Sequence, residues 1–300
     1  MVKYHEPVLR DAAVEGLAIK PNSICIDVTF GGGGHSRAIL EKLEKGRLIA
    51  FDQDMDALAN KPDDKRFELV HDNFRNLQYC LEEIKAIPAD ALLADLGVSS
   101  HQFDEAARGF SIRFNADLDM RMDQRSELTA KEILNFYQEH ELIRIFREYG
   151  ELKNAKRIAQ SIIRARSIKQ IETVDELKII VAGCAIRGKE HSFLAQLFQA
   201  LRIEVNDELG ALRDLLEQTP NVLREGGRLV VISYHSLEDR MVKNFINTGN
   251  TAGELQKDFF GNVIGLKFKS ITRKPTEPSA EEVLVNPRSR SAKMRIAEKL

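Results

Sequence analysis

The chain has 300 residues, with 44 basic and 46 acidic side chains, a net charge of −2 and 43% hydrophobic residues. This length fits one large or two ordinary domains, and the apolar content suffices for a packed core. The charge balance excludes a uniformly basic nucleic-acid coat protein. Residues 264–300 nevertheless hold nine basic and four acidic side chains, which indicates either a nucleic-acid contact or a solvated terminal segment.

The cysteine content and the hydropathy indicate in which compartment the protein works. Cys25, Cys80 and Cys184 lie far apart, and no C-x-x-C motif occurs. Such a sparse, odd set argues against a disulfide framework or a zinc site and favours a reducing compartment. No export signal is present at the N-terminus, and no apolar run reaches the roughly 18 residues needed to cross a membrane. We expect a cytoplasmic protein without a metal centre or a membrane contact.

The first third of the chain alternates between two patterns. Apolar runs predict strands at residues 24–28, 47–51, 67–70 and 91–94. Helix-like segments predict helices at residues 12–16, 36–43, 56–59 and 77–84. This alternation is typical of a parallel sheet with crossover helices, so we expect an α/β fold.

The first predicted strand leads into four consecutive glycines at residues 31–34 and then into a helix. This layout is typical of a nucleotide-binding crevice, because glycines let the backbone approach a ligand and the helix N-terminus offers unpaired N–H groups. Asp27 lies in the strand before the glycines. Asp52 ends the second strand, 19 residues after Gly33, where an acid can accept hydrogen bonds from both ribose hydroxyls.

Both NAD and S-adenosylmethionine fit this arrangement. A dinucleotide site favours G-x-G-x-x-G, but Ser36 stands at the third glycine position, with His35 beside it. S-adenosylmethionine presents an ammonium and a carboxylate, which suit an acid such as Asp27 near a glycine turn. These residues favour S-adenosylmethionine, and an NAD-dependent dehydrogenase is the alternative.

Polar residues follow three of the predicted strands. Asp95 ends the fourth strand at the edge where ligands bind in such sheets, although it could also serve only as a helix cap. Phe74 follows the third strand, either packing on an adenine ring or belonging to the core. A Ser/His hydrolase based on residues 233–236 is disfavoured, because no G-x-S-x-G elbow occurs. His235 is expected to anchor a loop or line the pocket.

The middle of the chain contains no convincing strand. Capping boxes beginning at Thr129 and Thr173 open two helices, and further helices are expected at residues 139–147, 152–166, 193–202 and 207–218. The 152–166 helix carries a basic face. Residues 118–123, LDMRMD, form either a substrate rim or a salt-bridged loop.

A strand at 227–233 and a helix at 237–245 follow, and then a long loop with at most one hairpin at 247–286. We therefore expect an α/β domain in two parts, 1–110 and 211–300, around a helical insertion at 111–210.

Eight sequence blocks, spread over nearly the whole chain, resemble the MraW family of bacterial ribosomal RNA small subunit methyltransferases. They are HEPVL at 5–9, DVTFGGGGHS at 27–36, DLGVSSHQFD at 95–104, RGF at 108–110, LDMRMD at 118–123, FQALRIEVNDEL at 198–209, GGRLVVISYHSLEDR at 226–240 and NPRSRSAKMRIAEK at 286–299. Two departures lie in the expected insertion. Asn115, Ala116 and Asp117 stand where the family has a proline turn, and Gln196 replaces a usual arginine.

The resemblance implies a Rossmann-like class I S-adenosylmethionine-dependent methyltransferase with an inserted all-helical substrate-recognition domain. The implied reaction is methyl transfer to the exocyclic N4 of a cytidine in the decoding region of 16S rRNA, within the assembled small ribosomal subunit. Carried over by motif, the cofactor-binding residues are Gly33, Gly34, His35, Asp52, Phe74, Asp95 and Gln102.

Asp95 is also the candidate catalytic residue, because the amino nitrogen must be held in line with the methyl group and must lose a hydrogen. Phe103 or Phe110 could stack on an unstacked target base, or belong to the core. Phosphates would be held by the basic face of the 152–166 helix and by Arg288, Arg290, Lys293 and Arg295. The alternatives are a DNA or small-molecule methyltransferase and a non-catalytic RNA-binding protein. The sequence leaves the oligomeric state open.

Overall fold

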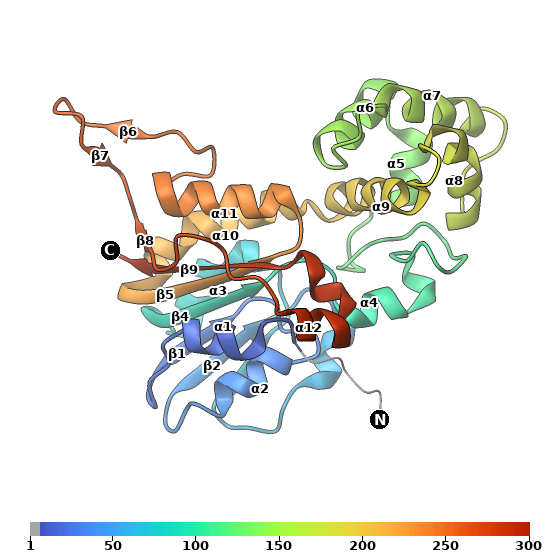
Figure 1. The fold of residues 1–300 in the computed structure, drawn as a ribbon. Coiled ribbons are helices and arrows are strands. Elements are labelled where there is room, and N and C mark those ends of the chain that lie inside the picture. The colour runs from blue at the N-terminus through green and yellow to red at the C-terminus, as the bar shows by residue number, and fades with distance from the viewer. Residues whose placement is uncertain (1–6) are drawn as a thin grey trace. The chain divides into compact units, whose positions relative to one another are not determined.

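A computed structural model describes residues 7–300, which fall into two compact units (Figure 1). One unit, here called the α/β unit, consists of residues 7–97 and Leu209–Leu300, and the other, the helical unit, is Val98–Glu208. His5 and Glu6, part of the first family block, lie outside the described residues. None of the helices formed by the described residues is both long and apolar enough to cross a membrane.

A seven-stranded sheet in the order β3-β2-β1-β4-β5-β9-β8 forms the centre of the α/β unit. The first five strands in this order are parallel, and β9 runs antiparallel to both β5 and β8. The strands are β1 (Ile24–Asp27), β2 (Arg47–Phe51), β3 (Phe67–Val70), β4 (Ala89–Asp95), β5 (Leu223–Ser233), β8 (Phe268–Ser270) and β9 (Lys293–Lys299). The strand order reverses at β1, so the carboxyl ends of β1 and β4 flank the crevice where such sheets bind ligands. The predicted α/β fold is confirmed.

Helices cover both faces of the sheet. Successive strand side chains point to opposite faces, so Ile26 packs with α3, α10 and α11, whereas Cys25 packs with α1 and α2. The helices of this unit are α1 (Arg10–Gly16), α2 (Gly34–Leu40), α3 (Leu77–Glu83), α10 (Glu208–Val222), α11 (Ser236–Thr248) and α12 (Ala280–Val285). The helix expected at residues 56–59 is a 3-10 helix, η1 (Met55–Asn60), and two more are η2 (Phe74–Asn76) and η5 (Pro287–Ser291).

In the C-terminal part, the one hairpin considered for residues 247–286 is present, but β8, α12 and β9 differ from the expected loop and basic tail. A hairpin of β6 (Gln256–Lys257) and β7 (Val263–Ile264) precedes β8, and β9 lies inside the sheet between β5 and β8. Met294 and Ile296 are buried, while the basic residues that alternate with them, Lys293 and Arg295, are half-buried. These residues were expected to form a basic tail because of their charge. The alternation of buried and partly buried side chains along β9 is instead typical of a half-buried strand.

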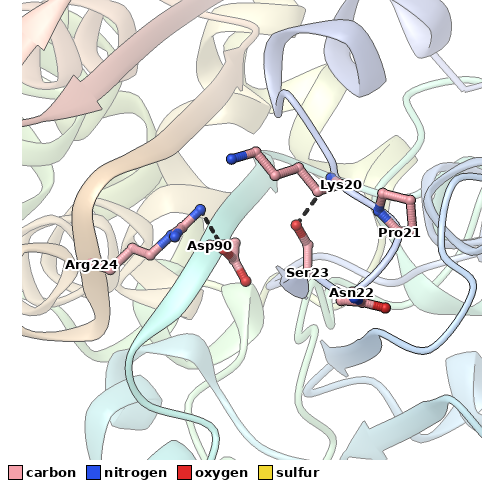
Figure 2. Close-up of a pocket in the computed structure, with 6 residues that line it drawn as sticks. All are labelled: Lys20, Pro21, Asn22, Ser23, Asp90 and Arg224. Atoms are coloured by element: carbon pink, nitrogen blue, oxygen red, sulfur yellow. Dashed lines mark hydrogen bonds and ion pairs between the residues drawn. The ribbon is translucent and has the colours of Figure 1, made fainter.

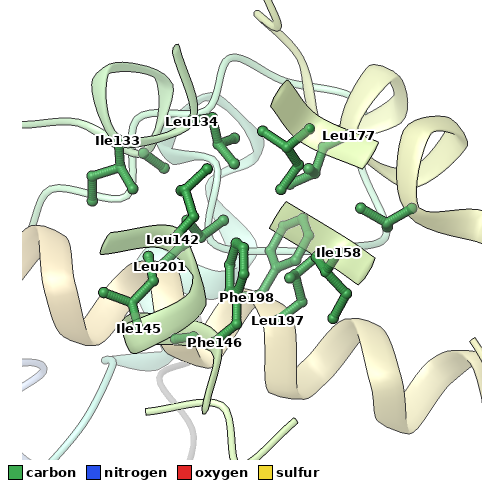
Figure 3. Packing of buried hydrophobic residues seen from close by; sticks show 14 of the residues in the cluster. Ile133, Leu134, Leu142, Ile145, Phe146, Ile158, Leu177, Leu197, Phe198 and Leu201 are labelled. Carbon is green, nitrogen blue, oxygen red and sulfur yellow. The ribbon is translucent and has the colours of Figure 1, made fainter. Parts of the chain in front are cut away.

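The helical unit has a hydrophobic core of its own, in which Phe146, Ile158, Leu197 and Leu201 meet (Figure 3). Its helices are α4 (Ser100–Asp104), η3 (Ala106–Arg108), α5 (Ala130–Phe136), α6 (Glu139–Glu148), α7 (Ala155–Arg166), α8 (Val174–Val181), η4 (Ala182–Cys184) and α9 (Glu190–Asn206). The capping boxes predicted at Thr129 and Thr173 open α5 and α8.

Candidate functional site

Three aspartates lie at the carboxyl ends of three neighbouring strands. Asp27 ends β1, Asp95 ends β4, and Asp52 follows β2 directly. Since the strands are ordered β2-β1-β4, the three carboxyl groups gather at one edge of the sheet. The charge of Asp27 contributes to raising the pKa values of both Asp52 and Asp95, as expected for groups that share one crevice.

The glycine turn is joined to the end of β2. The N–H of Gly31 donates to Oδ2 of Asp52 at 2.7 Å, and the Asn60 side chain donates to the Gly31 carbonyl at 3.0 Å. Gly33 caps α2 with φ +73°, and a Cβ there would lie 2.8 Å from the Phe30 ring. Gly34 is constrained differently, since its Cβ would meet Pro7 at 2.3 Å. Only glycine therefore fits this turn as it is packed.

Both carboxylate oxygens of Asp27 accept hydrogen bonds from other residues of the protein. Its Oδ1 accepts from the Thr29 N–H at 3.2 Å, and its Oδ2 accepts from the Ser36 hydroxyl at 2.7 Å. Burial raises its pKa. The Thr29 hydroxyl also accepts from the Asp95 N–H at 2.7 Å, which joins the ends of β1 and β4. Asp27 thus supports the crevice, a role that its strand position did not reveal.

Asp95 lies between a tyrosine and a histidine. The Tyr234 hydroxyl donates to Oδ1 of Asp95 at 2.8 Å, and Nδ1 of His35 lies 3.6 Å from Oδ2. Nε2 of His35 lies 3.1 Å from the Val8 carbonyl, which can only accept, so Nε2 carries a hydrogen. Burial raises the pKa of Asp95 to about 6, while His35 and the Tyr234 hydroxyl act in the opposite direction. Burial also raises the pKa of Tyr234, which keeps this hydroxyl a donor.

Asp52 is a second strongly perturbed acid. Burial raises its pKa to about 6, although the N–H groups of Asp54 and Gly31 favour its ionised form. Phe74 follows β3 at the same edge, half-buried against the core. Gln102 belongs to the helical unit, where its side-chain oxygen accepts from the Ser99 N–H in the capping box of α4. The structure therefore groups Gly33, Gly34, His35, Asp52 and Asp95 in one unit.

This set of groups fits S-adenosylmethionine. The cofactor carries a positive sulfonium and a positive ammonium, which three carboxyl groups attract, and Asp52 stands where an acid can meet ribose hydroxyls. The same carboxyl groups would repel the pyrophosphate of NAD. The donor chemistry of the crevice thus agrees with the cofactor predicted from the sequence.

In the helical unit, the structure favours one of the two alternatives that the sequence left open for residues 118–123 and for Phe110. Residues 118–123 form the salt-bridged loop, with Arg121 paired to Asp119 at 2.8 Å and Leu118, Met120 and Met122 buried. Phe110 is also buried in this core, so it is not free to stack on a base. Both assignments follow from burial, which local sequence alone does not specify.

The predicted phosphate contacts divide into two groups. Lys156, Arg157 and Arg164 of α7 are exposed, as expected, and so is Lys153, just before the helix. Arg295 was wrongly expected to face phosphates: it lies on β9 and pairs with Asp239 of α11 at 2.7 Å, with both side chains largely buried.

A surface hollow of about 360 Å³ lies at the opposite edge of the sheet (Figure 2). Ser23 precedes β1, Asp90 is the second residue of β4, and Arg224 near the start of β5 pairs with Asp90 at 2.7 Å. The hollow is therefore separate from the crevice at the carboxyl ends.

Comparison with known proteins shows the family of the chain. The MraW methylase family model matches residues 2–300. Ribosomal RNA small subunit methyltransferase H of Parabacteroides distasonis is 52% identical over 99% of this chain and 98% of its own, and the protein of that name from Flavobacterium johnsoniae is 52% identical over 100% and 99%. An rRNA methylase structure from Streptococcus thermophilus covers 97% of this chain and 93% of its own, at 14% identity and a TM-score of 0.41, too low to carry an argument.

The parallel sheet and its acidic crevice define an S-adenosylmethionine-dependent methyltransferase of the Rossmann-like class. Within that class, the chain belongs to the MraW methylase family.

Proposed function

We propose that this methyltransferase acts on the exocyclic N4 of a cytidine in the decoding region of 16S rRNA, within the assembled small ribosomal subunit. The observation that carries the proposal is the Asp95 carboxyl group, positioned by Tyr234 and His35 at the crevice of an MraW-family chain. The printed names of the relatives support ribosomal RNA as the substrate. The N4 target and a cytoplasmic location remain predictions from the sequence.

The residues proposed to hold the cofactor are those of the crevice. Gly33, Gly34 and His35 would contact its amino-acid part, Asp52 its ribose and Phe74 its adenine. Gln102, from the helical unit, completes the predicted set. When bound, S-adenosylmethionine supplies a methyl group on a positively charged sulfur.

Asp95 is the proposed proton acceptor. The lone pair of a cytidine amino nitrogen is delocalised into the ring, so the nitrogen becomes an effective nucleophile only as it gives up a hydrogen. A carboxyl group with a pKa of about 6 is ionised at neutral pH and can accept that hydrogen. Tyr234 orients the carboxylate through its hydroxyl, and His35, whose Nδ1 lies 3.6 Å from the other oxygen, favours the ionised form of Asp95.

Substrate recognition is proposed for the helical unit. The exposed cations of α7 suit a phosphate backbone, whereas the α/β unit supplies the chemistry. This division agrees with the insertion expected at residues 111–210, although the compact unit spans Val98–Glu208.

The deciding experiment measures transfer of labelled methyl from S-adenosylmethionine to purified small subunits that lack the modification, with nucleoside mass spectrometry. We expect N4-methylated cytidine, and its loss in Asp95→Ala at unchanged cofactor binding would support the catalytic role. If cofactor binds but neither subunits nor naked 16S rRNA accept methyl, the proposed substrate is wrong, and DNA or small molecules become the candidates.

A further inference from the structure

The β6–β7 hairpin carries two unusually exposed aromatic rings. Phe259 is 98% exposed and Phe260 86% exposed, and their rings meet edge to face with centroids 5.7 Å apart. Leu255, Val263 and Ile264 on the arms of the same hairpin are also exposed. A contiguous apolar surface of this kind commonly marks a binding site.

The tip that presents these rings is an ordered turn. Oδ1 of Asp258 accepts from the N–H groups of Phe260 and Asn262 at 2.9 and 2.8 Å, and the Asn262 side chain donates to Oδ2 at 3.0 Å. Gly261 provides the positive φ, +86°, that closes the turn. The rings are therefore held outward by the backbone instead of folding back.

The base of the hairpin is equally constrained. Gly249 ends α11, and a Cβ there would lie 2.1 Å from the Gly265 carbonyl oxygen, so the two segments are in close contact. Oδ1 of Asn250 accepts from the N–H groups of Gly253 and Glu254 at 2.9 and 3.1 Å. With both ends fixed in this way, the hairpin is preorganised for binding.

The charge around the hairpin indicates which partner it suits. Residues 254–274 carry five basic and two acidic side chains, although the whole chain has a net charge of −2. All five cations are exposed, and none of them forms an ion pair with another described residue. They are Lys257, Lys267, Lys269, Arg273 and Lys274. Two copies of this surface would repel each other, which argues against self-association. Aromatic rings at the hairpin tip, with one cation on the hairpin and four in and around the following strand, match single-stranded RNA, whose bases stack on aromatic rings and whose phosphates pair with cations.

The location of the hairpin separates it from the reaction. The hairpin precedes β8. The first residue of β8, Phe268, pairs with Lys299, which lies at the opposite ends of the strands from Asp95. Helix α11, 13 residues long, runs from the crevice edge to the hairpin base and so spans about 20 Å. A nucleotide at the tip is therefore not the one that is methylated.

We infer that the hairpin is a second RNA-binding element, which stacks Phe259 and Phe260 on unpaired bases of the substrate remote from the target cytidine. This inference rests on the proposed function, because it takes ribosomal RNA as the substrate.

A tryptophan reporter tests the inference, because the chain contains no tryptophan. Phe260→Trp places the fluorophore at the tip, and Tyr79→Trp, at a 68% exposed position on α3, is the matched control. On addition of small ribosomal subunits or 16S rRNA, we expect quenching in Phe260→Trp and no change in Tyr79→Trp. In parallel, Phe259→Ser combined with Phe260→Ser should raise KM for subunits about tenfold at unchanged kcat.

The other outcomes overturn the inference. An unchanged Phe260→Trp signal under conditions where the unsubstituted chain methylates subunits would exclude the hairpin from the RNA site. A blue shift with brighter emission, on subunits or on anionic lipid vesicles without RNA, would assign the tip to a protein pocket or a lipid surface. Absence of methyl transfer by the unsubstituted chain counts against the proposed function alone, since quenching reports binding.

Discussion

At the residue scale, Asp95 combines two requirements that oppose each other. Burial stabilises its protonated form, whereas His35 and the Tyr234 hydroxyl favour the carboxylate, and the resulting pKa is about 6. A proton acceptor works best when its pKa lies near the pH at which it operates. The neighbours of Asp95 therefore adjust its chemistry as well as its position.

Removing the hydroxyl of Tyr234 should shift the pH profile. In Tyr234→Phe the Asp95 carboxylate loses a hydrogen bond that lowers its pKa, so that pKa rises and less of the ionised form remains at neutral pH. We expect the acid limb of the kcat/KM profile to move upward by about one pH unit, and activity near pH 6.5 to fall about threefold. Activity should recover above pH 8, with cofactor affinity unchanged. A uniform decrease at every pH would instead mean that Tyr234 has only a structural role.

The glycine turn permits a matched comparison. Gly33 and Gly226 have φ values of +73° and +71°, so alanine incurs a similar backbone cost of about 1 kcal/mol at each. A Cβ meets no atom within 4 Å at Gly226 but meets the Phe30 ring at Gly33. We expect Gly33→Ala to weaken S-adenosylmethionine binding at least tenfold by calorimetry, and Gly226→Ala to leave it unchanged. Equal affinities would remove this turn from the cofactor site.

At the element scale, sequence patterns predicted the buried parallel strands well, because residues 48–51 of β2 and 91–94 of β4 are continuous apolar runs. The capping boxes of α5 and α8 were equally visible, since both partners lie within four residues. Strand β9 was missed because three of its half-buried positions carry the basic residues Lys293, Arg295 and Lys299, which suggested a charged tail. The contact between Tyr234 and Asp95 was also missed: it depends on β5 lying beside β4, and pairing between distant segments cannot be read from either segment alone.

If Arg295 stabilises the fold and does not bind phosphate, its removal should lower the free energy of unfolding. Its ion pair with Asp239 joins β9 to α11, with side chains only 13% and 15% exposed. Arg295→Ala leaves a largely buried carboxylate unpaired, and should lower the free energy of unfolding by about 3 kcal/mol. The exposed Arg290, changed to alanine, should alter it by less than about 0.5 kcal/mol. Denaturant titration distinguishes the two, and similar small losses would restore Arg295 as a candidate phosphate contact.

Helix α7 should contribute to the salt dependence of RNA binding. Reversing Lys156 and Arg157 to glutamate removes two exposed cations, so RNA affinity should fall and the slope of log K against log salt should decrease by roughly one per cation. Lys42→Glu with Lys45→Glu makes the same change of net charge on the α/β unit and is the control. An equal effect of both pairs would indicate a general charge effect and not a site on α7.

At the scale of the whole molecule, the chain consists of two units with separate hydrophobic cores. The crevice residues Gly33, His35, Asp52 and Asp95 belong to one unit, and the basic α7 helix belongs to the other. Cofactor binding at the crevice and RNA binding at α7 should therefore be separable by substitution.

Hydrogen exchange with and without cofactor tests that separation. A ligand present at 100 times its Kd stabilises the structure that binds it by about 2.7 kcal/mol, so S-adenosylmethionine should slow exchange of the β1, β4 and α2 amides about a hundredfold where exchange requires unfolding of their unit. The core of the helical unit, including Phe146 and Leu197, has no part in the crevice, and its amides in α6 and α9 should exchange as before. Removal of the cofactor should reverse the effect. Equal protection of both units would show that they unfold as one cooperative structure, and the assignment of separate roles to them would then need a different basis.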